Sequence, residues 1–131
     1  MTQNIEIPTS IGELIDKITI LEIKTENITD KAKLKNVQNE LQALQTIQKN
    51  QIPQSTELTT LTDALKKVNL ALWDIEDKIR ECEQNNAFDT TFIELARSVY
   101  ITNDKRAQLK KDINLHTGST YVEEKSYENY N

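Results

Sequence analysis

The sequence predicts an all-α protein, an antiparallel helical bundle of about four helices arranged as two long helical hairpins. Apolar residues recur three and four positions apart through most of the 131 residues, which is the spacing of amphipathic helices. With two glycines and two prolines, the chain has few positions that favour a turn. A chain of this length is expected to form a single domain and to bury a core without disulfides.

The first hairpin is predicted from two neighbouring helical patterns, over residues 10–28 and 30–50. Ser10 and Glu13 have the spacing of a capping box, in which the serine oxygen accepts from the Glu13 amide and the Glu13 carboxylate returns to the serine amide. Asp30 is the N-cap expected for the second helix. Because one or two residues connect the two helices, they should be antiparallel neighbours.

The third helix, predicted over residues 56–85 after a loop at Pro53, has the strongest pattern in the chain. Eight apolar residues alternate three and four apart along it, which predicts knobs-into-holes packing of the coiled-coil type. They are Leu58, Leu61, Leu65, Val68, Leu72, Ile75, Ile79 and Cys82.

The fourth helix is predicted over residues 89–115. Asp89 is its expected N-cap, and Phe88 is expected to pack as a hydrophobic staple on Phe92 or Ile93. His116 lies at the end of this helix, where a cation complements the helix dipole, so capping is favoured over catalysis.

The two termini are predicted to lie outside the helices. Residues 1–9 form an extended arm, since Pro8 disfavours helix before it, and residues 119–131 form a polar tail that is expected to be mostly loose. Ile5 and Ile7 alternate with polar residues, so a minor two-stranded ribbon with Tyr121–Val122 is a second possibility.

Composition restricts the location and the partners of the protein. The formal net charge of −5 disfavours nucleic-acid binding, although Lys105, Arg106, Lys110 and Lys111 form a local basic group. No stretch approaches the roughly 18 apolar residues of a membrane span, and the first ten residues do not resemble a signal peptide. Cys82 cannot form an intramolecular disulfide and is predicted to be a small buried hydrophobe. A cytoplasmic protein without membrane or nucleic-acid partners is expected.

The predicted helix lengths indicate self-association. The third helix should extend about 45 Å and the first about 28 Å, so the second hairpin should overhang the first. Part of its apolar seam would then have no cover within the chain, and a homodimer is the simplest way to bury it. The candidate interface residues are Trp73, Leu58 and Leu61.

Patterns typical of metal and cofactor sites are missing from the sequence. There is no Gly-rich phosphate loop, no cysteine pair and a single histidine, so no cofactor is expected. Acidic residues cluster between 74 and 83, but Lys78 and Arg80 are interleaved with them. Pairs such as Asp74–Lys78 and Glu76–Arg80 predict a self-neutralising surface rather than a metal site.

The most informative exception to the apolar pattern is Arg106. The seam of the fourth helix predicts apolar residues near 103 and 106, where the sequence has Asn103 and Arg106. Burial of an unpaired guanidinium is costly, so Arg106 requires a carboxylate, water or a ligand anion. An internal polar network with Glu13, Asp16 or Glu22 is one interpretation. A second is an anion-binding polar cluster made by Arg97, Asn103, Arg106, Lys17, Lys24 and Glu76. A third is simple exposure of the Arg106 side chain at the surface.

Four segments resemble a known family. They are GELIDKITILEIKTENI (residues 12–28), LWDIEDKIRECE (72–83), FIELARSVYITNDKRAQLKKDIN (92–114) and VEEKSY (122–127). The chain is similar in these motifs to a family of small helical proteins of bacteria and their phages. That family has no established activity, so the resemblance implies neither a substrate nor a cofactor.

Two functions are therefore left open by the sequence. A non-enzymatic, self-associating helical protein that binds a protein partner is favoured by the long seam and by the missing catalytic set. The alternative is a small helical-bundle enzyme or anion-ligand-binding protein that uses the Arg/Lys/Asn polar cluster for electrostatic positioning.

Overall fold

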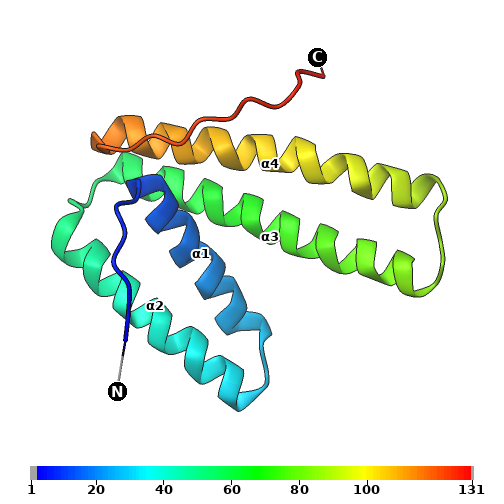
Figure 1. Ribbon diagram of the computed structural model, residues 1–131, viewed down its shortest axis with the longest axis horizontal. Coiled ribbons are helices and arrows are strands. Elements are labelled where there is room, and N and C mark those ends of the chain that lie inside the picture. The colour runs from blue at the N-terminus through cyan, green and yellow to red at the C-terminus, as the bar shows by residue number, and fades with distance from the viewer. Residues whose placement is uncertain (1–2, 131) are drawn as a thin grey trace.

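A computed structural model describes residues 3–130 and contains, within them, four helices. They are α1 (Ile11–Asn27), α2 (Lys31–Gln51), α3 (Thr56–Gln84) and α4 (Thr90–Thr117). Helices α1 and α2 form one hairpin, and α3 and α4 form a longer one (Figure 1). The predicted all-α class is confirmed. Residues 1 and 2 of the predicted arm and residue 131 of the tail lie outside the described residues.

The helices begin where the sequence supplies a capping oxygen. Each N-cap side chain accepts a hydrogen bond from the backbone N–H three residues later, at 2.9–3.3 Å; the caps are Ser10, Asp30, Ser55 and Asp89. The capping box predicted at Ser10 is only half formed, because the Glu13 carboxylate contacts Lys110 of α4 instead. Phe88 packs on Phe92 as the predicted staple, with ring centroids 5.2 Å apart.

Helix α1 is the central element although it is the shortest. It packs against α2, α3 and α4, whereas α2 contacts no other helix than α1 within the described residues. Seven residues of α1 are buried and none of α2. The core lies where α1 meets the N-terminal half of α3 and the C-terminal half of α4, and it contains Ile15, Ile52, Leu58, Leu65 and Ile113.

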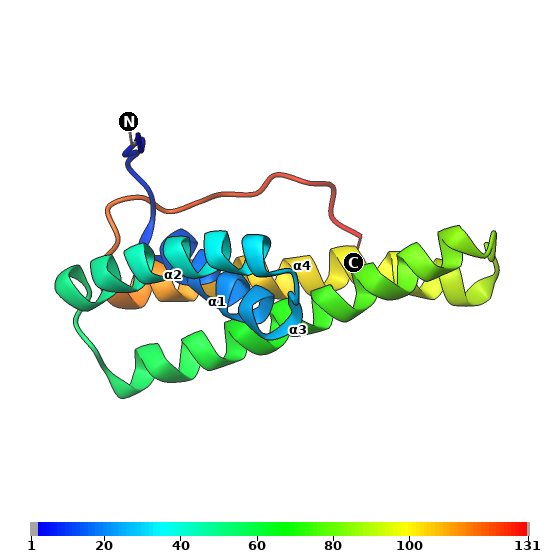
Figure 2. The ribbon, with the colours of Figure 1, turned by 90° about the horizontal axis from the view of Figure 1, so that it is seen from below.

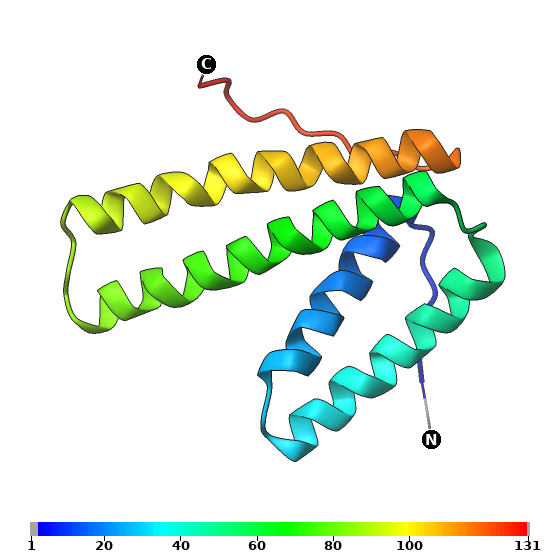
Figure 3. The same ribbon diagram turned by 180° about the vertical axis from the view of Figure 1, so that it is seen from behind.

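The far half of the α3–α4 hairpin extends beyond α1. The buried residues of α3 fall between 58 and 69 and those of α4 between 110 and 114. Residues 74–99, here called the distal hairpin, comprise the end of α3, the connection after it and the start of α4, and all three ribbon views show them projecting from the rest of the molecule (Figures 1, 2 and 3). The apolar row of α3 from Leu58 to Cys82 is here called the α3 seam, and its part from Ile75 to Cys82, in the distal hairpin, is half-buried.

The C-terminal tail follows α4 in an extended conformation instead of hanging loose (Figure 1). Gly118 reverses the chain with a φ of 68°, a left-handed conformation that glycine adopts without strain. The tail is then tied to α4 by the ion pairs Lys110–Glu123, Lys111–Glu124 and Lys125–Asp104. No strand is present among residues 3–130, so the ribbon between the termini is not seen.

Candidate functional site

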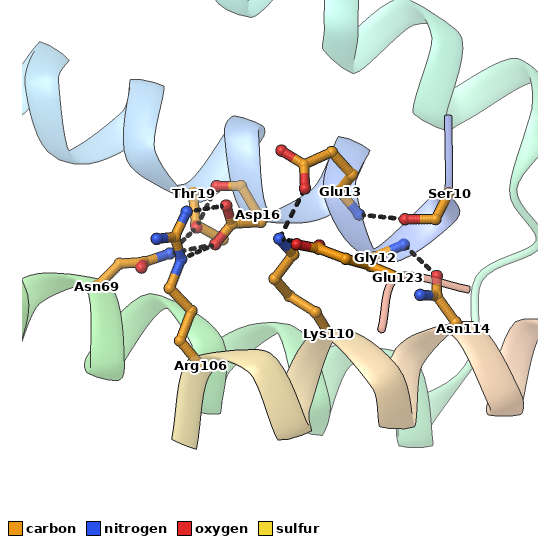
Figure 4. Close-up of polar contacts among 10 residues, drawn as sticks. All are labelled: Ser10, Gly12, Glu13, Asp16, Thr19, Asn69, Arg106, Lys110, Asn114 and Glu123. Carbon is orange, nitrogen blue, oxygen red and sulfur yellow. Dashed lines mark hydrogen bonds and ion pairs between the residues drawn. The ribbon is translucent and has the colours of Figure 1, made fainter. Parts of the chain in front are cut away.

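A buried polar junction joins α1, α3 and α4 (Figure 4). Asp16 of α1 is 1% exposed, and its carboxylate accepts from Arg106 of α4 through Nε at 2.9 Å and Nη2 at 2.5 Å. Asn69 of α3 donates to the same carboxylate at 2.9 Å. Of the three acids proposed as partners of Arg106, the structure therefore selects Asp16. The hydrogen bonds that Arg106 donates to Asp16 raise the pKa of Arg106, so the guanidinium stays charged.

The junction is completed by hydroxyl and amide groups that the sequence analysis did not include. Asn69 Nδ2 also donates to Thr19 Oγ1 at 2.9 Å, and Thr19 Oγ1 donates to the backbone carbonyl of Asp16 at 2.7 Å. Asn69 follows the seam residue Val68, so a polar side chain beside the seam was the available signal. The network fixes how α1, α3 and α4 are aligned along their axes, because Asn69 of α3 and Arg106 of α4 must both reach the Asp16 carboxylate of α1.

One turn further along α4, Lys110 is the centre of a second group of ion pairs. Its side chain is 10% exposed, and its Nζ contacts Glu13 of α1 at 2.6 Å and Glu123 of the tail at 2.7 Å (Figure 4). Burial lowers the pKa of Lys110, but the hydrogen bonds that its ammonium donates to Glu123 and Glu13 outweigh the effect of burial, so the pKa lies above its ordinary value. Lys110 thereby joins α1, α4 and the tail.

Helices α1 and α4 approach most closely at Gly12. Its backbone N–H donates to Asn114 Oδ1 at 2.7 Å, and a Cβ at this position would lie 2.5 Å from the carbonyl oxygen of Lys110. Only glycine fits this contact. Asn114 is 1% exposed, and its Nδ2 has no hydrogen-bond partner within the described residues.

The tail and α4 enclose an open groove of about 1010 Å³, here called the tail groove. Its lining includes Tyr100, Asn103, Arg106 and Lys110 of α4 together with Lys125 and Tyr130 of the tail. Asp104 accepts from Lys125 at 2.8 Å and from the Tyr130 hydroxyl at 2.7 Å, and these two contacts lower the pKa of Asp104. The Tyr130 ring meets Tyr100 edge to face at 5.1 Å between centroids.

A second opening lies between the two hairpins. This inter-hairpin cleft, of about 410 Å³, has an apolar wall made by Ile20, Ile23, Leu72 and Trp73. Its charged rim includes Glu76 and Arg80, which form an ion pair at 3.6 Å. The pair Glu76–Arg80 was predicted from the i,i+4 spacing. Arg106 borders both openings.

A comparison with protein families gives one match. Residues 4–130 match the model of DUF6165, a family of unknown function. The chain belongs to this family. No curated protein and no solved structure matches the chain. The family match covers nearly the whole chain, but it supplies no activity for the junction or for either opening.

In this member of DUF6165, the polar cluster predicted from the sequence is divided between the two openings. Arg106 lines the tail groove with Asn103 and the inter-hairpin cleft with Glu76. The remaining three predicted members, Lys17, Lys24 and Arg97, line neither opening. Lys17 pairs instead with Glu40 of α2 at 2.8 Å, on the other side of α1. The six residues therefore do not form one site.

The three candidate interface residues have different surroundings. Trp73 is half-buried in the wall of the inter-hairpin cleft. Leu58 is 2% exposed and packs within the core of its own chain, so it offers no surface to a partner, and half-buried Leu61 packs against the same core. The interface assignment of Leu58 is thus corrected. Leu58 is buried because α1 and Ile52 cover this end of the seam.

Other groups considered from the sequence also have contacts. His116 lies in the last turn of α4, where its Nε2 is 3.2 Å from the Ser55 hydroxyl. Cys82 is a free, half-buried cysteine.

No group of three or more metal-binding side chains is found within residues 3–130. The same part of the chain contains no helix that is long and apolar enough to cross a membrane.

Proposed function

We propose that the protein is a non-enzymatic, self-associating helical interaction protein and that it pairs with a second copy through the distal hairpin. One observation carries this proposal. The apolar seam continues to Cys82, but the helix that buries its first half does not extend over its second half.

Two helices alone cannot enclose an apolar seam, because each contributes one face and the edges between them stay open to water. The distal hairpin accordingly carries half-buried Ile75 and Ile79 on α3 with Phe92 and Leu95 on α4. Two large apolar side chains near its turn are more than half exposed, Phe88 at 53% and Ile93 at 55%. A second distal hairpin would complete a four-helix bundle, the arrangement that buries such seams in helical proteins.

Light scattering after size-exclusion chromatography tests this proposal. The wild-type chain is expected to be a dimer at high micromolar concentration. Ile93→Glu, which places a charge on the exposed face of the distal hairpin, should move it towards the monomer. Leu115→Glu is the matched control, since Leu115 is 66% exposed on the same helix outside the distal hairpin. A wild-type chain that stays monomeric at these concentrations would contradict self-association.

A second candidate function, anion-ligand binding or catalysis in the tail groove, is favoured by the fixed guanidinium of Arg106 at its border. We place it second because the cations of the groove already meet carboxylates: Arg106 meets Asp16, Lys110 meets Glu123 and Lys125 meets Asp104. Phosphate and dicarboxylates are suitable probes in a thermal-shift screen. A rise in the melting temperature that Asn103→Ala removes would support this function, and no shift would oppose it.

Two further expectations are kept as proposals. The resemblance of the four sequence motifs supports an origin in bacteria or their phages, and the single cysteine supports a cytoplasmic location.

A further inference from the structure

The inter-hairpin cleft has the size and the walls of a small-molecule site. Its volume of about 410 Å³ lies in the range in which proteins bind small ligands. Helix α1 contributes Ile20 and Ile23 to the apolar wall, and α3 contributes Leu72 and Trp73. Trp73 is the single tryptophan of the chain, so its fluorescence reports on this cleft alone.

The floor of the cleft, formed by Asn69 and Arg106, offers a fixed hydrogen-bond acceptor. Asn69 is 5% exposed, and its Nδ2 donates to Asp16 Oδ1 and to Thr19 Oγ1. Since Thr19 gives its own proton to the backbone carbonyl of Asp16, both partners of Asn69 are acceptors, and the amide has a single possible orientation. The other amide atom, Oδ1, forms no hydrogen bond within residues 3–130. A buried acceptor held in this way favours a ligand that donates to it.

A donor lies beside this acceptor. Arg106 donates to Asp16 through Nε and Nη2, and it shares the Asp16 Oδ1 atom with Asn69, so the two head groups lie side by side (Figure 4). The third guanidinium nitrogen, Nη1, meets no acceptor in the described part of the chain. The floor therefore combines one acceptor, Asn69 Oδ1, with one neighbouring donor, Arg106 Nη1.

The charges around the cleft favour a neutral ligand over an anion. The guanidinium of Arg106 is already compensated by the buried carboxylate of Asp16. The rim adds Glu76, Asp77 and Arg80, which together carry a net charge of −1. An anion would enter a slightly negative site and would bring a further acceptor to an oxygen that needs a donor. A ligand that has both a carbonyl and an N–H satisfies both groups of the floor.

We infer that the inter-hairpin cleft binds a neutral, planar ring that carries a carbonyl next to an N–H, the chemistry of a cyclic amide or imide such as a pyrimidine base. The carbonyl accepts from Arg106 Nη1, the N–H donates to Asn69 Oδ1, and the ring packs on Trp73. This inference goes beyond the proposed self-association and does not depend on it, because none of these three residues belongs to the distal hairpin.

The fluorescence of Trp73 tests the assignment in the wild-type, full-length chain. Uracil is the probe, since it is uncharged at neutral pH and has a carbonyl beside each N–H. Its addition should change the tryptophan emission to a plateau, with a dissociation constant of about 1 mM for a ligand of this size. The matched control is 1,3-dimethyluracil, which keeps the ring and both carbonyls but has no N–H. It should bind at least about fivefold more weakly, because it leaves Asn69 Oδ1 unpaired.

Two variants locate the site within the protein. Asn69→Ala should remove the preference for uracil over 1,3-dimethyluracil, and its melting temperature is recorded because Asn69 also bonds to Asp16 and Thr19. Asn36→Ala is the control, since it removes an exposed amide of α2 and should leave both affinities unchanged. The comparison of the two ligands on the wild-type chain stands even where Asn69→Ala fails to fold.

Benzoate, a planar anion without an N–H, distinguishes a neutral-ring site from an anion site. A preference for uracil over both 1,3-dimethyluracil and benzoate supports the inference. Tighter binding of benzoate, equal binding of uracil and its dimethyl derivative, or an emission that no ligand changes overturns it. Light scattering measures the oligomeric state separately, so any of these results leaves the proposed self-association standing.

Discussion

The two halves of the α3 seam have the same sequence pattern and different environments. In the first half, Leu58 and Leu65 are 2% and 0% exposed, and Leu61 and Val68 between them are half-buried. In the second half, every residue of the row from Leu72 to Cys82 is half-buried and none is fully buried. Helix α1 covers the first half and ends before the second. The comparison teaches that heptad spacing specifies which face of a helix is apolar, but the length of the neighbouring helix decides how much of that face is buried.

The largest expected effect tests this difference directly. Leu65→Ala should lower the free energy of unfolding by about 3 kcal/mol, because a fully buried leucine leaves a cavity. Ile79→Ala should cost about 1 kcal/mol when urea denaturation is followed at low protein concentration, since its side chain is already part-solvated. Equal losses would show that the distal hairpin is covered within the monomer. A larger loss for Ile79→Ala at high concentration would sharpen the comparison by locating the dimer contact.

The polar junction belongs to the covered half, and its expected effect is intermediate. Asp16→Asn replaces the carboxylate that accepts from Arg106 and Asn69 by an amide, and it should lower the free energy of unfolding by about 2 kcal/mol. A double-mutant cycle with Arg106→Met should give a coupling of at least about 1 kcal/mol. Purely additive losses would mean that the two side chains do not stabilise each other.

The smallest expected effect concerns the tail, which is held on the surface. Contacts with Lys125 and Tyr130 lower the pKa of Asp104 below its ordinary value of 3.8, so docking of the tail is favoured by the ionised carboxylate. The docked state should be fully present above pH 3.8 and lost as the pH falls through the lowered pKa. The NMR signals of the Tyr130 ring report the change. Asp104→Asn should release residues 125–130 at neutral pH without changing the urea midpoint, and unchanged signals would contradict this.

Local features of the fold were predictable because each depends on neighbouring residues. Three of the four N-caps, Ser10, Asp30 and Asp89, and the Phe88–Phe92 staple were predicted, because they involve groups three or four positions apart, which the sequence shows directly. The need of Arg106 for a partner was also visible, because a guanidinium interrupts an apolar row. Its neighbours Asn69 and Thr19 were not assigned a role, since a single amide or hydroxyl beside a seam is an ordinary surface residue unless another helix covers it.

By itself, the sequence determined the helices, their ends and the apolar faces, since backbone hydrogen bonds and side-chain periodicity act over a few residues. Only the tertiary structure decided that Asp16, rather than Glu13 or Glu22, meets Arg106, that Glu13 leaves its capping box for Lys110, and that the tail binds along α4. The Asp16 and Glu13 contacts join residues 90 or more positions apart. Their geometry follows from the close approach of α1 and α4 at Gly12, which no local pattern encodes.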